Sequence, residues 1–495
     1  MTTVHRVLFP DPIRDLAEYL TRRGGQGLEA ARKVKPEVVI AELEASGLRG
    51  RGGAGFPTGT KWRTVSEHRS DAVQATVVVN AAEGEPGTFK DRTILRNNPY
   101  HVLEGALIAA HAIGARNVVF GMKKTFVTEM DRVRRAIKEA YEAGWANADE
   151  LEITIFEGPG EYLYGEETAL LEVLGGRYPF PRIAPPYRRG LLEVVQTETQ
   201  ASSGSGLAGP IEMAGTEEDG SAPPTLVDNV ETLANVPRII SRGAAWFRTE
   251  GTEESPGTVV CTVTGSVRHP GVGEVPMGTP LREVIEVVGG GALPGQRIQA
   301  VLPGVATGFI GPDQLDTPLT YEAMRDAGSG LGSAGFMVFD DTVDIAAVGA
   351  GVSRFLAVES CGQCTPCKQD GLALSDLMAK VCRSEVEEHD LEAIADRVQT
   401  VSTEARCYLA LQHQAVLGSL LERFPESLRA HLNGDSPAVE PVLVAELVNI
   451  SDAGAVVEER FRDKQPDWTY NEEYSGQSPA DRFGEHRSPG SLEEG

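Results

Sequence analysis

The sequence predicts an α/β fold in which a parallel sheet is covered by helices. Apolar, β-branched segments read as strands, and each is followed by a segment with helical periodicity. The strand-like segments lie at residues 75–80, 117–122 and 151–158, and the helix-like segments at 101–115, 126–144 and 164–176. Strands that alternate with helices at this spacing are typical of a parallel, Rossmann-like sheet. Ligands of such sheets bind beyond the carboxyl ends of the strands.

The loops at those carboxyl ends are rich in polar side chains. Asn80, Glu83 and Glu85 follow the first strand. They suit hydrogen bonding to ribityl or ribose hydroxyls, although an ordinary acidic turn would also explain them. Glu166 and Glu167 lie in the first turn of a later helix, where they either cap the helix or face the sugar or a neutral ring of a ligand, since carboxylates repel phosphate.

A glycine loop at residues 48–62 contains the pattern G-x-G-x-x-G at Gly50, Gly52 and Gly55. A dinucleotide-binding turn needs a strand before it and a helix after it. Residues 36–47 have helical periodicity instead, and we expect Pro57 and Gly59 to interrupt any following helix. The loop is therefore predicted to be either a surface turn or a bare backbone on which a flat ligand lies. In the second case Arg49, Arg51 and Lys61 supply positive charge.

Four cysteines carry the strongest chemical signal. Cys361, Cys364 and Cys367 form C-x2-C-x2-C, and Cys407 follows in a region with helical periodicity. A tight triplet with one distant cysteine favours a 4Fe-4S cluster over zinc, which usually takes two separate C-x2-C pairs. Cys261 and Cys382 are predicted to be buried packing residues.

Bulk properties limit the class of protein. The 495 residues suffice for about three domains. A net charge of -26 argues against nucleic acid or an anionic membrane as the main partner. The chain has neither a run of about twenty apolar residues nor a secretory signal, and its few cysteines suit a reducing compartment. We expect a cytoplasmic protein without direct membrane insertion, which could be peripheral to a membrane complex.

Five motifs occur in the order found in one family. They are GRGGAGFPTGTKW (50–62), NAAEGEPGTFKDR (80–92), YGEETALLE (164–172), DNVETLANVP (228–237) and ESCGQCTPC (359–367). With them the chain, over roughly residues 15–430, resembles the NADH-binding flavoprotein subunit of bacterial respiratory complex I. It is similar as well to the related diaphorase subunits of NAD-linked hydrogenases and formate dehydrogenases.

The resemblance implies four regions. They are an FMN/NAD(H)-binding α/β domain at 1–245, a β-grasp-like domain of the SLBB type at 250–342, a helical-bundle 4Fe-4S domain at 343–434, and an acidic tail at 435–495. The tail is polar and rich in Gly, Pro and Ser, a composition that predicts disorder.

The resemblance also implies a set of site residues, position by position. FMN and nicotinamide would be bound by Gly50, Arg51, Gly52, Phe56, Lys61, Asn80, Glu83, Tyr162, Gly165, Glu166, Glu167, Asp228, Asn229 and Thr232. Catalytic roles would fall to Glu83, Glu85 and Glu167. The residues in contact with NADH would be Phe56, Glu85, Tyr162 and Tyr187. The ligands of the one 4Fe-4S cluster would be Cys361, Cys364, Cys367 and Cys407.

The function implied by the resemblance is NADH oxidation. Hydride would pass from NADH to FMN, and single electrons would then pass to the cluster and on to partner subunits. The implied partners are a 2Fe-2S thioredoxin-like subunit and a larger iron-sulfur or redox-enzyme subunit.

Four positions depart from the family pattern. Ala82 replaces an Asp, Thr64 an aromatic residue, Ala184 a Lys and Asp228 an Asn. Loss of a cation and of a stacking ring points to altered NADH binding. Two alternatives therefore stay open: an FMN/4Fe-4S relay or regulatory subunit that uses another donor, and a zinc-stabilised structural subunit.

Overall fold

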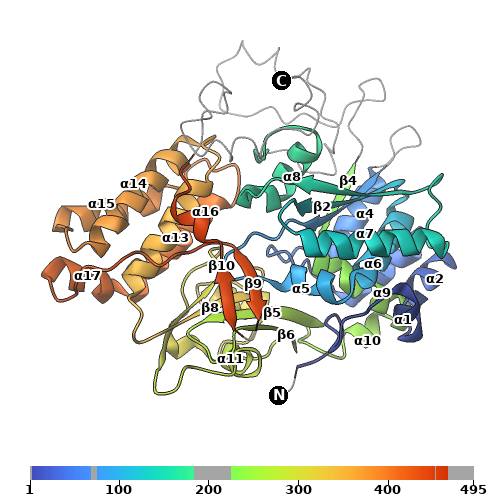
Figure 1. Ribbon diagram of the computed structural model, residues 1–495, viewed down its shortest axis with the longest axis horizontal. Coiled ribbons are helices and arrows are strands. Elements are labelled where there is room, and N and C mark those ends of the chain that lie inside the picture. The colour runs from blue at the N-terminus through green and yellow to red at the C-terminus, as the bar shows by residue number, and fades with distance from the viewer. Residues whose placement is uncertain (1–2, 69–74, 183–223, 452, 467–495) are drawn as a thin grey trace, which may run out of the picture.

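The computed structural model describes residues 3–68, 75–182, 224–451 and 453–466 (Figure 1). The predicted contacts of Tyr187 and the departure at Ala184 lie outside these residues. The elements of the first domain are α1 (Leu16–Thr21), α2 (Gln26–Arg32), α3 (Pro36–Ser46), α4 (Thr58–Glu67), β1 (Thr76–Ala81), α5 (Lys90–Asn97), α6 (Pro99–Ile113), β2 (Asn117–Lys123), α7 (Val127–Glu142), β3 (Glu152–Gly158), the 3-10 turn η1 (Tyr162–Gly165), α8 (Glu167–Leu174), β4 (Thr225–Asn229), α9 (Val230–Arg242) and α10 (Ala244–Phe247).

The first sheet has four parallel strands in the order β3-β2-β1-β4. Its strand β1 is buried on both faces. Val77 and Val79 belong to the core that includes α6, whereas Val78 packs with Leu170 of α8 and Val227 of β4 in a second cluster. Burial on both faces explains the uninterrupted apolar run of this strand. The predicted parallel-sheet fold is confirmed, and β4 is a strand that the prediction lacked.

One expectation about the glycine loop is wrong, because a helix does follow it. Pro57 sits at the N-cap of α4, where a missing N–H costs nothing, and α4 continues through Gly59. A Cβ on Gly59 would come within 2.6 Å of the backbone nitrogen of Glu44. Glycine at this position therefore allows α3 and α4 to pack closely, and Trp62 and Val65 of α4 are buried.

The second domain contains a mixed four-stranded sheet. Its elements are β5 (Thr258–Gly265), β6 (Gly271–Pro276), α11 (Leu281–Gly289), β7 (Ile298–Pro303), the 3-10 turn η3 (Pro312–Gln314), α12 (Tyr321–Asp326) and β8 (Gly335–Asp340). The strand order is β6-β5-β8-β7, with a central parallel pair and antiparallel edge strands. With α11 packed against β5 and β6, this is the β-grasp-like arrangement that was predicted. Cys261 is fully buried in β5, as expected for a packing residue.

The third domain is helical. It consists of α13 (Ile345–Glu359), α14 (Thr365–Cys382), α15 (Glu388–Thr400), α16 (Leu409–Arg423) and α17 (Pro425–Asn433). Helix α13 is buried along nearly its whole length, because α14 and α16 pack against it. Cys382 is buried at the end of α14.

The prediction of a disordered tail is wrong for the part that ends at residue 466. Residues 447–451 and 454–457 form a hairpin of β9 (Leu447–Ser451) and β10 (Gly454–Val457), followed by the turn η4 (Glu459–Arg462). Val444, Leu447 and Phe461 are buried. These few apolar residues suffice to dock a segment whose average composition is polar. In Figure 1 the hairpin lies between the helical domain and the first domain.

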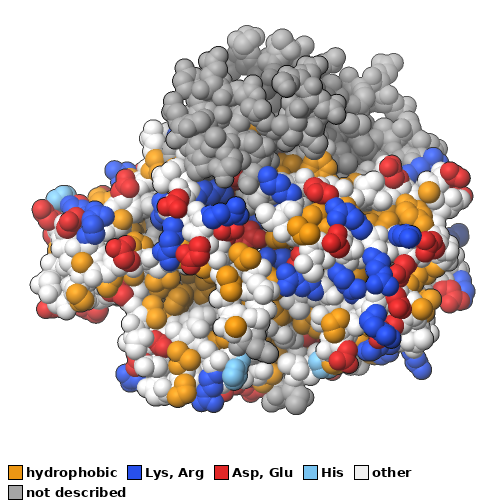
Figure 2. Space-filling view, in the orientation of Figure 1, with side chains coloured by type: hydrophobic (Ala, Val, Ile, Leu, Met, Phe, Trp, Pro, Cys, Tyr) orange, Lys and Arg blue, Asp and Glu red, His pale blue; other side chains and the backbone are white. Residues whose placement is uncertain are grey.

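The visible face of the described part of the chain mixes both signs of charge (Figure 2). Figure 2 shows basic and acidic side chains interspersed over the visible face, including the region of α7. On this face the basic side chains are not gathered into one broad positive field of the kind that attracts nucleic acid. Among the described residues, none of the helices has the length and apolar character needed to cross a membrane.

Candidate functional site

The carboxyl edge of the first sheet brings two predicted site residues together. Asn80 of β1 and Asn229 of β4 are paired in register. The Asn80 amide donates to the carbonyl oxygen of Gly165 (2.8 Å), which ties the end of β1 to η1. Asn229 is the N-cap of α9, and its side chain accepts from the backbone N–H of Glu231 (3.0 Å). The sheet register therefore places three separate predicted motifs at one edge.

The glycine loop lies against the start of α9. The backbone N–H of Arg51 donates to the Thr232 hydroxyl (2.8 Å). The Arg51 guanidinium donates to the hydroxyl of Tyr321 (3.1 Å), and that hydroxyl donates to the carbonyl of Gly50 (2.9 Å). Because Tyr321 belongs to α12, the second domain helps to fix the loop. Arg51 is buried, and its Nε has no hydrogen-bond partner among the described residues.

The loop leaves open backbone for a flat ligand. A Cβ on Gly50 would lie no closer than 3.5 Å to any protein atom, so packing within the protein does not require glycine there. A Cβ on Gly52 would come within 3.3 Å of Asn229. Phe56 is 53% exposed at the end of the loop. An accessible backbone beside an exposed ring and a helix N-terminus suits FMN, whose phosphate is an anion and whose ring is flat.

Lys61 is shared between two carboxylates at this edge. Its Nζ lies 2.8 Å from Glu167 and 4.0 Å from Asp228, and it donates to the carbonyl of Val227 (2.6 Å). Burial opposes the ammonium charge, but the two carboxylates outweigh it and raise the pKa of Lys61. Trp62 donates its Nε1–H to Asp228 (2.6 Å). The group carries one positive and up to two negative charges beside the glycine loop.

Asp228, one of the departures, makes this site sensitive to pH. Burial raises its pKa to about 6, although Lys61 and Trp62 act in the opposite direction. A raised carboxyl pKa means that the folded state loses stability as pH rises from about 4, the pKa of an unfolded Asp, to about 6. We expect Asp228→Asn to stabilise the cofactor-free protein by about 3 kcal/mol at most above pH 6, with no gain below pH 4. Urea unfolding between pH 4 and 8 measures this. Asp316→Asn, at an exposed carboxylate, is the control, and a gain that did not depend on pH would contradict the expectation.

The structure contains a buried charge network around Asn229 that was not predicted. Lys90 Nζ lies 2.7 Å from Asp91 and 3.0 Å from Glu231, and it donates to Asn229 Oδ1 (3.1 Å). The Asn229 amide in turn donates to Asp91 (2.6 Å). These groups fix both ends of the Asn229 side chain. The lysine and aspartate of the TFKDR segment were the available sequence signal, since charged residues are rarely fully buried unless they are paired.

Glu83 serves the start of α5. Its carboxylate accepts from the backbone N–H of Asp91 (2.9 Å) and pairs with Arg92 (3.2 Å). Burial and the neighbouring Asp91 raise the pKa of Glu83, although Arg92 counteracts them. Helix α5 has no side-chain cap from its own N-cap residue, Phe89, so Glu83 supplies one from the preceding loop.

Glu85 lies where all three domains meet. It accepts from the hydroxyl of Tyr162 (2.5 Å) and from the backbone N–H of Val305 (2.6 Å). Gln412 of α16 donates to the same Tyr162 hydroxyl (2.8 Å). Burial raises the pKa of Glu85 to about 7. Tyr162 and Glu85, both predicted to contact NADH, thus form a direct hydrogen bond at the junction.

Glu166 acts as a helix cap. Its carboxylate accepts from the backbone N–H groups of Thr168 (3.0 Å) and Ala169 (2.8 Å) at the start of α8. Burial raises its pKa, although those hydrogen bonds oppose the shift. The neighbouring Glu167 instead faces Lys61. Of the two open interpretations, capping describes Glu166. The ion pair of Glu167 with Lys61 was part of neither interpretation, and a ligand contact of Glu167 stays a prediction.

The structure shows the surroundings of two more residues that depart from the family pattern, Ala82 and Thr64. Ala82 is buried directly after β1. Thr64 is half-buried on α4, and its hydroxyl donates to the carbonyl of Thr60 (2.9 Å).

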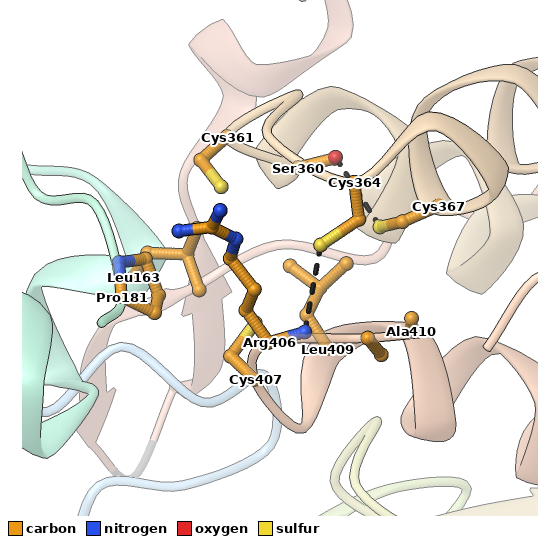
Figure 3. Close-up of a pocket in the computed structure, with 11 residues that line it drawn as sticks. Leu163, Pro181, Ser360, Cys361, Cys364, Cys367, Arg406, Cys407, Leu409 and Ala410 are labelled. Carbon is orange, nitrogen blue, oxygen red and sulfur yellow. Dashed lines mark hydrogen bonds between the residues drawn. The ribbon is translucent and has the colours of Figure 1, made fainter. Parts of the chain in front are cut away.

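The four cysteines surround one cavity (Figure 3). Cys361, Cys364 and Cys367 come from the start of α14 and the segment before it, and Cys407 comes from the segment before α16. Leu163, Pro181 and Leu409 supply apolar walls. Among the described residues, no three Cys, His, Asp or Glu side chains are placed to hold a single metal ion. Sulfurs spread around a cavity suit a multi-iron cluster better than one zinc ion.

Protein groups already donate to the sulfurs. Gln363 Nε2 donates to Cys361 (3.4 Å), the backbone N–H of Arg406 donates to Cys364 (3.4 Å), and Ser360 Oγ lies 3.4 Å from Cys367. Burial raises the pKa of Cys361, and it raises that of Cys367 to about 11. Burial raises the pKa of Cys407 as well. Thiols of this kind become thiolates when a metal binds, and hydrogen bonds to them tune the potential of a cluster.

The fold and the two sites define an electron-transfer subunit with a nucleotide-type cofactor and an iron-sulfur cluster. Three family models match the chain: the Nuo51 FMN-binding domain at residues 43–238, the SLBB domain at 260–306, and the NADH-ubiquinone oxidoreductase-F iron-sulfur binding region at 347–431. The chain is 36% identical over 423 residues to the F 2 subunit of NADH-quinone oxidoreductase from Rhizobium meliloti (strain 1021), covering 83% of this chain and 94% of that protein. It belongs to the F-subunit family of NADH-quinone oxidoreductases.

A second F subunit and a solved structure are also similar to this chain. The corresponding F subunit from Streptomyces coelicolor is 35% identical over 430 residues, or 86% of this chain and 89% of that protein. A crystal structure of NAD+-reducing [NiFe]-hydrogenase in the H2-reduced state matches with a TM-score of 0.71 and 31% identity, covering 85% of this chain and 67% of that one. The family, the fold class and the FMN and 4Fe-4S cofactors predicted from the sequence are confirmed.

Proposed function

We propose that this chain oxidises NADH through bound FMN and passes the electrons singly, through a 4Fe-4S cluster, to a partner subunit. One observation carries the proposal: an open glycine loop with a lysine and a helix N-terminus occurs in the same chain as a cavity lined by four cysteines. Each NADH gives NAD+, a proton and two electrons. FMN supplies the group that accepts a hydride and releases single electrons, a conversion that side chains cannot perform.

The residues at the sheet edge have distinct roles in this proposal. The backbone of Gly50 and Gly52 lies against FMN, and the start of α9 at Asn229 and Thr232 binds its phosphate. Asn80 and Glu83 bind the ribityl chain and the edge of the ring. These assignments rest on the open backbone of the loop and on the register that pairs Asn80 with Asn229.

The nicotinamide side of the site is assigned to a second group of residues. Phe56 contacts NADH because its ring is exposed beside the loop. Glu85 and Tyr162 hold the junction closed. Glu167 lies along the cavity shared by flavin and nicotinamide, paired with Lys61, which itself lines FMN. The cysteine set Cys361, Cys364, Cys367 and Cys407 holds the cluster.

The electrons need an acceptor outside this chain. We propose a 2Fe-2S thioredoxin-like subunit and a larger iron-sulfur or redox-enzyme subunit as partners. Relatives that are named as components of NADH-quinone oxidoreductase support this, as does a structural match in a hydrogenase.

An anaerobic titration of the cluster-reconstituted protein with NADH tests the function. We expect flavin absorbance to bleach at one NADH per FMN, and the electron paramagnetic resonance signal of a reduced cluster to follow. If dithionite reduces both centres and NADH reduces neither, the chain uses another donor and the proposal fails. A colourless protein with one zinc per chain would support the structural alternative instead.

A further inference from the structure

The segment after the helical domain, residues 439–464, touches both domains that hold a cofactor site; we call it the C-terminal strap. On the helical side, the backbone N–H of Val439 donates to the carbonyl of Cys382 (2.8 Å), and that of Val442 to the carbonyl of Ala347 (3.0 Å). A Cβ on Gly351 would come within 2.0 Å of the Val442 carbonyl oxygen. Glycine in α13 therefore admits the strap at close range.

On the other side, the strap reaches the first domain. Glu446 lies 2.5 Å from Lys123 and 3.7 Å from Arg92. Arg92 also pairs with Glu83 of the loop after β1. Lys123 is 1% exposed and the Glu446 side chain 20% exposed, so their ion pair is partly shielded from water. The strap is thus linked by charge to a loop of the flavin site.

The end of the strap inserts a lysine between two buried carboxylates. Lys464 Nζ lies 2.7 Å from Glu359 and 3.2 Å from Glu161. Glu359 and Glu161 are 4% and 2% exposed. Arg354 of α13 fixes this end of the strap by donating to the carbonyls of Arg462 (2.8 Å) and Lys464 (2.9 Å).

The two carboxylates lead directly into the two cofactor sites. Glu161 directly precedes η1, and the chain continues from η1 to Glu167 at the start of α8. Glu359 directly precedes Ser360 and Cys361. Glu359 also accepts from the backbone N–H of Tyr162 (3.0 Å).

Aromatic packing reinforces the same junction. The Phe355 ring lies 5.2 Å from that of Tyr162 and 5.1 Å from that of Phe461 in the strap. The contacts of one flavin-site segment, one cluster-site segment and the strap therefore converge at Lys464.

Charge explains why a cation is needed here. Two buried carboxylates close to one ammonium repel each other and lose hydration, and the lysine compensates both effects. Without it, two buried carboxylates would face each other with no counter-charge, and we expect the junction to open to water. Breaking a buried pair by removal of one partner is far more disruptive than removal of an exposed one.

We propose that Lys464 is a positioning residue: it holds the Tyr162–Glu167 segment of the flavin site against the Ser360–Cys361 segment of the cluster site. The strap thereby sets the geometry for electron transfer between them. This inference rests on the proposed function and gives a role to a part of the chain whose composition alone predicts disorder.

Lys464→Met tests the proposal, with Lys464→Arg as the conservative variant. Arg462→Met is the matched control, because Arg462 pairs with Glu459 at the surface. Two steps are followed after anaerobic rapid mixing with NADH: flavin bleaching and appearance of the reduced cluster signal. In Lys464→Met we expect cluster reduction to be slowed about tenfold or more relative to flavin bleaching in the same sample, because small misplacements of reacting groups cost this much or more. Arg462→Met and Lys464→Arg should stay near the wild type.

Hydrogen exchange in the oxidised protein gives a second readout. In Lys464→Met we expect faster hydrogen exchange in peptides covering 161–167 and 359–364. In the control Arg462→Met we expect exchange at the wild-type rate in the same peptides. Unchanged exchange with unchanged cluster reduction would overturn the proposal. If NADH bleaches no variant, including the wild type, the proposed function fails while the exchange comparison still decides the role of Lys464. Should Lys464→Met not fold, Arg354→Met, which removes two hydrogen bonds to the strap, must show the same changes in smaller degree.

Discussion

Cys407→Ser is expected to abolish the 4Fe-4S cluster and leave the flavin site intact. Cys407 reaches the cavity from the segment before α16, whereas the other three cysteines come from one short segment. A cluster with three thiolates and a hydroxyl is weakly held, because thiolate sulfur is the ligand that iron-sulfur clusters require. The reduced cluster signal should disappear and the iron content should fall from about four per chain to near zero. NADH should still bleach the flavin.

Cys382→Ser is the matched control for this change. Cys382 is fully buried, whereas Cys407 is partly buried. Cys382 lies at the far end of α14, and burial raises the pKa of its thiol to about 12. It should keep the full iron content. A full cluster signal in Cys407→Ser would show that another group is the fourth ligand. Loss of the cluster in both variants would mean that stability, not ligation, is being measured, and thermal unfolding of each protein distinguishes these cases.

The cluster site shows which part of a site the sequence could predict. Spacing identifies Cys361, Cys364 and Cys367, because cysteines separated by only two residues must lie close together in space. Cys407 could be added only because a cluster needs a fourth thiolate. The hydrogen bonds from Gln363 and from the backbone of Arg406 depend on how two segments pack, and no local pattern carries that information.

The flavin site shows the same limit in another form. Parallel strands and carboxyl-end loops were predictable because apolar periodicity and polar residues at strand ends are local signals. The individual tasks of Glu83, Glu166 and Glu167 were not, since capping, ion pairing and ligand binding use the same side chain. The strands β9 and β10 were not predicted, because only a few buried apolar side chains hold this segment in place. The average composition of the tail is polar, so it does not reveal these few residues.

The second large effect is expected for Lys61→Met, which should weaken FMN binding by about 10- to 100-fold. A hydrogen bond to a charged group contributes about 1.5–3 kcal/mol, and about 1.4 kcal/mol is a factor of ten in affinity. Removal of the ammonium also leaves Glu167 and Asp228 unneutralised beside an anionic ligand. Flavin fluorescence during titration of the cofactor-free protein with FMN measures the change. Lys138→Met, at an exposed lysine of α7, is the control.

A double variant separates contact from charge. Lys61→Met combined with Asp228→Asn removes one positive and one negative charge, so the net charge of the site is that of the wild type. If the loss of affinity is mainly Coulombic, the double variant recovers most of it; if Lys61 acts by direct contact with FMN, the affinity stays low and the two changes add. Wild-type affinity of Lys61→Met for FMN at low salt would contradict both the Coulombic and the direct-contact explanation. It would mean that the FMN phosphate does not lie near Lys61. The outcome also determines what the aspartate at 228 does: it either lowers affinity through its charge above pH 6, or serves only to fix Trp62.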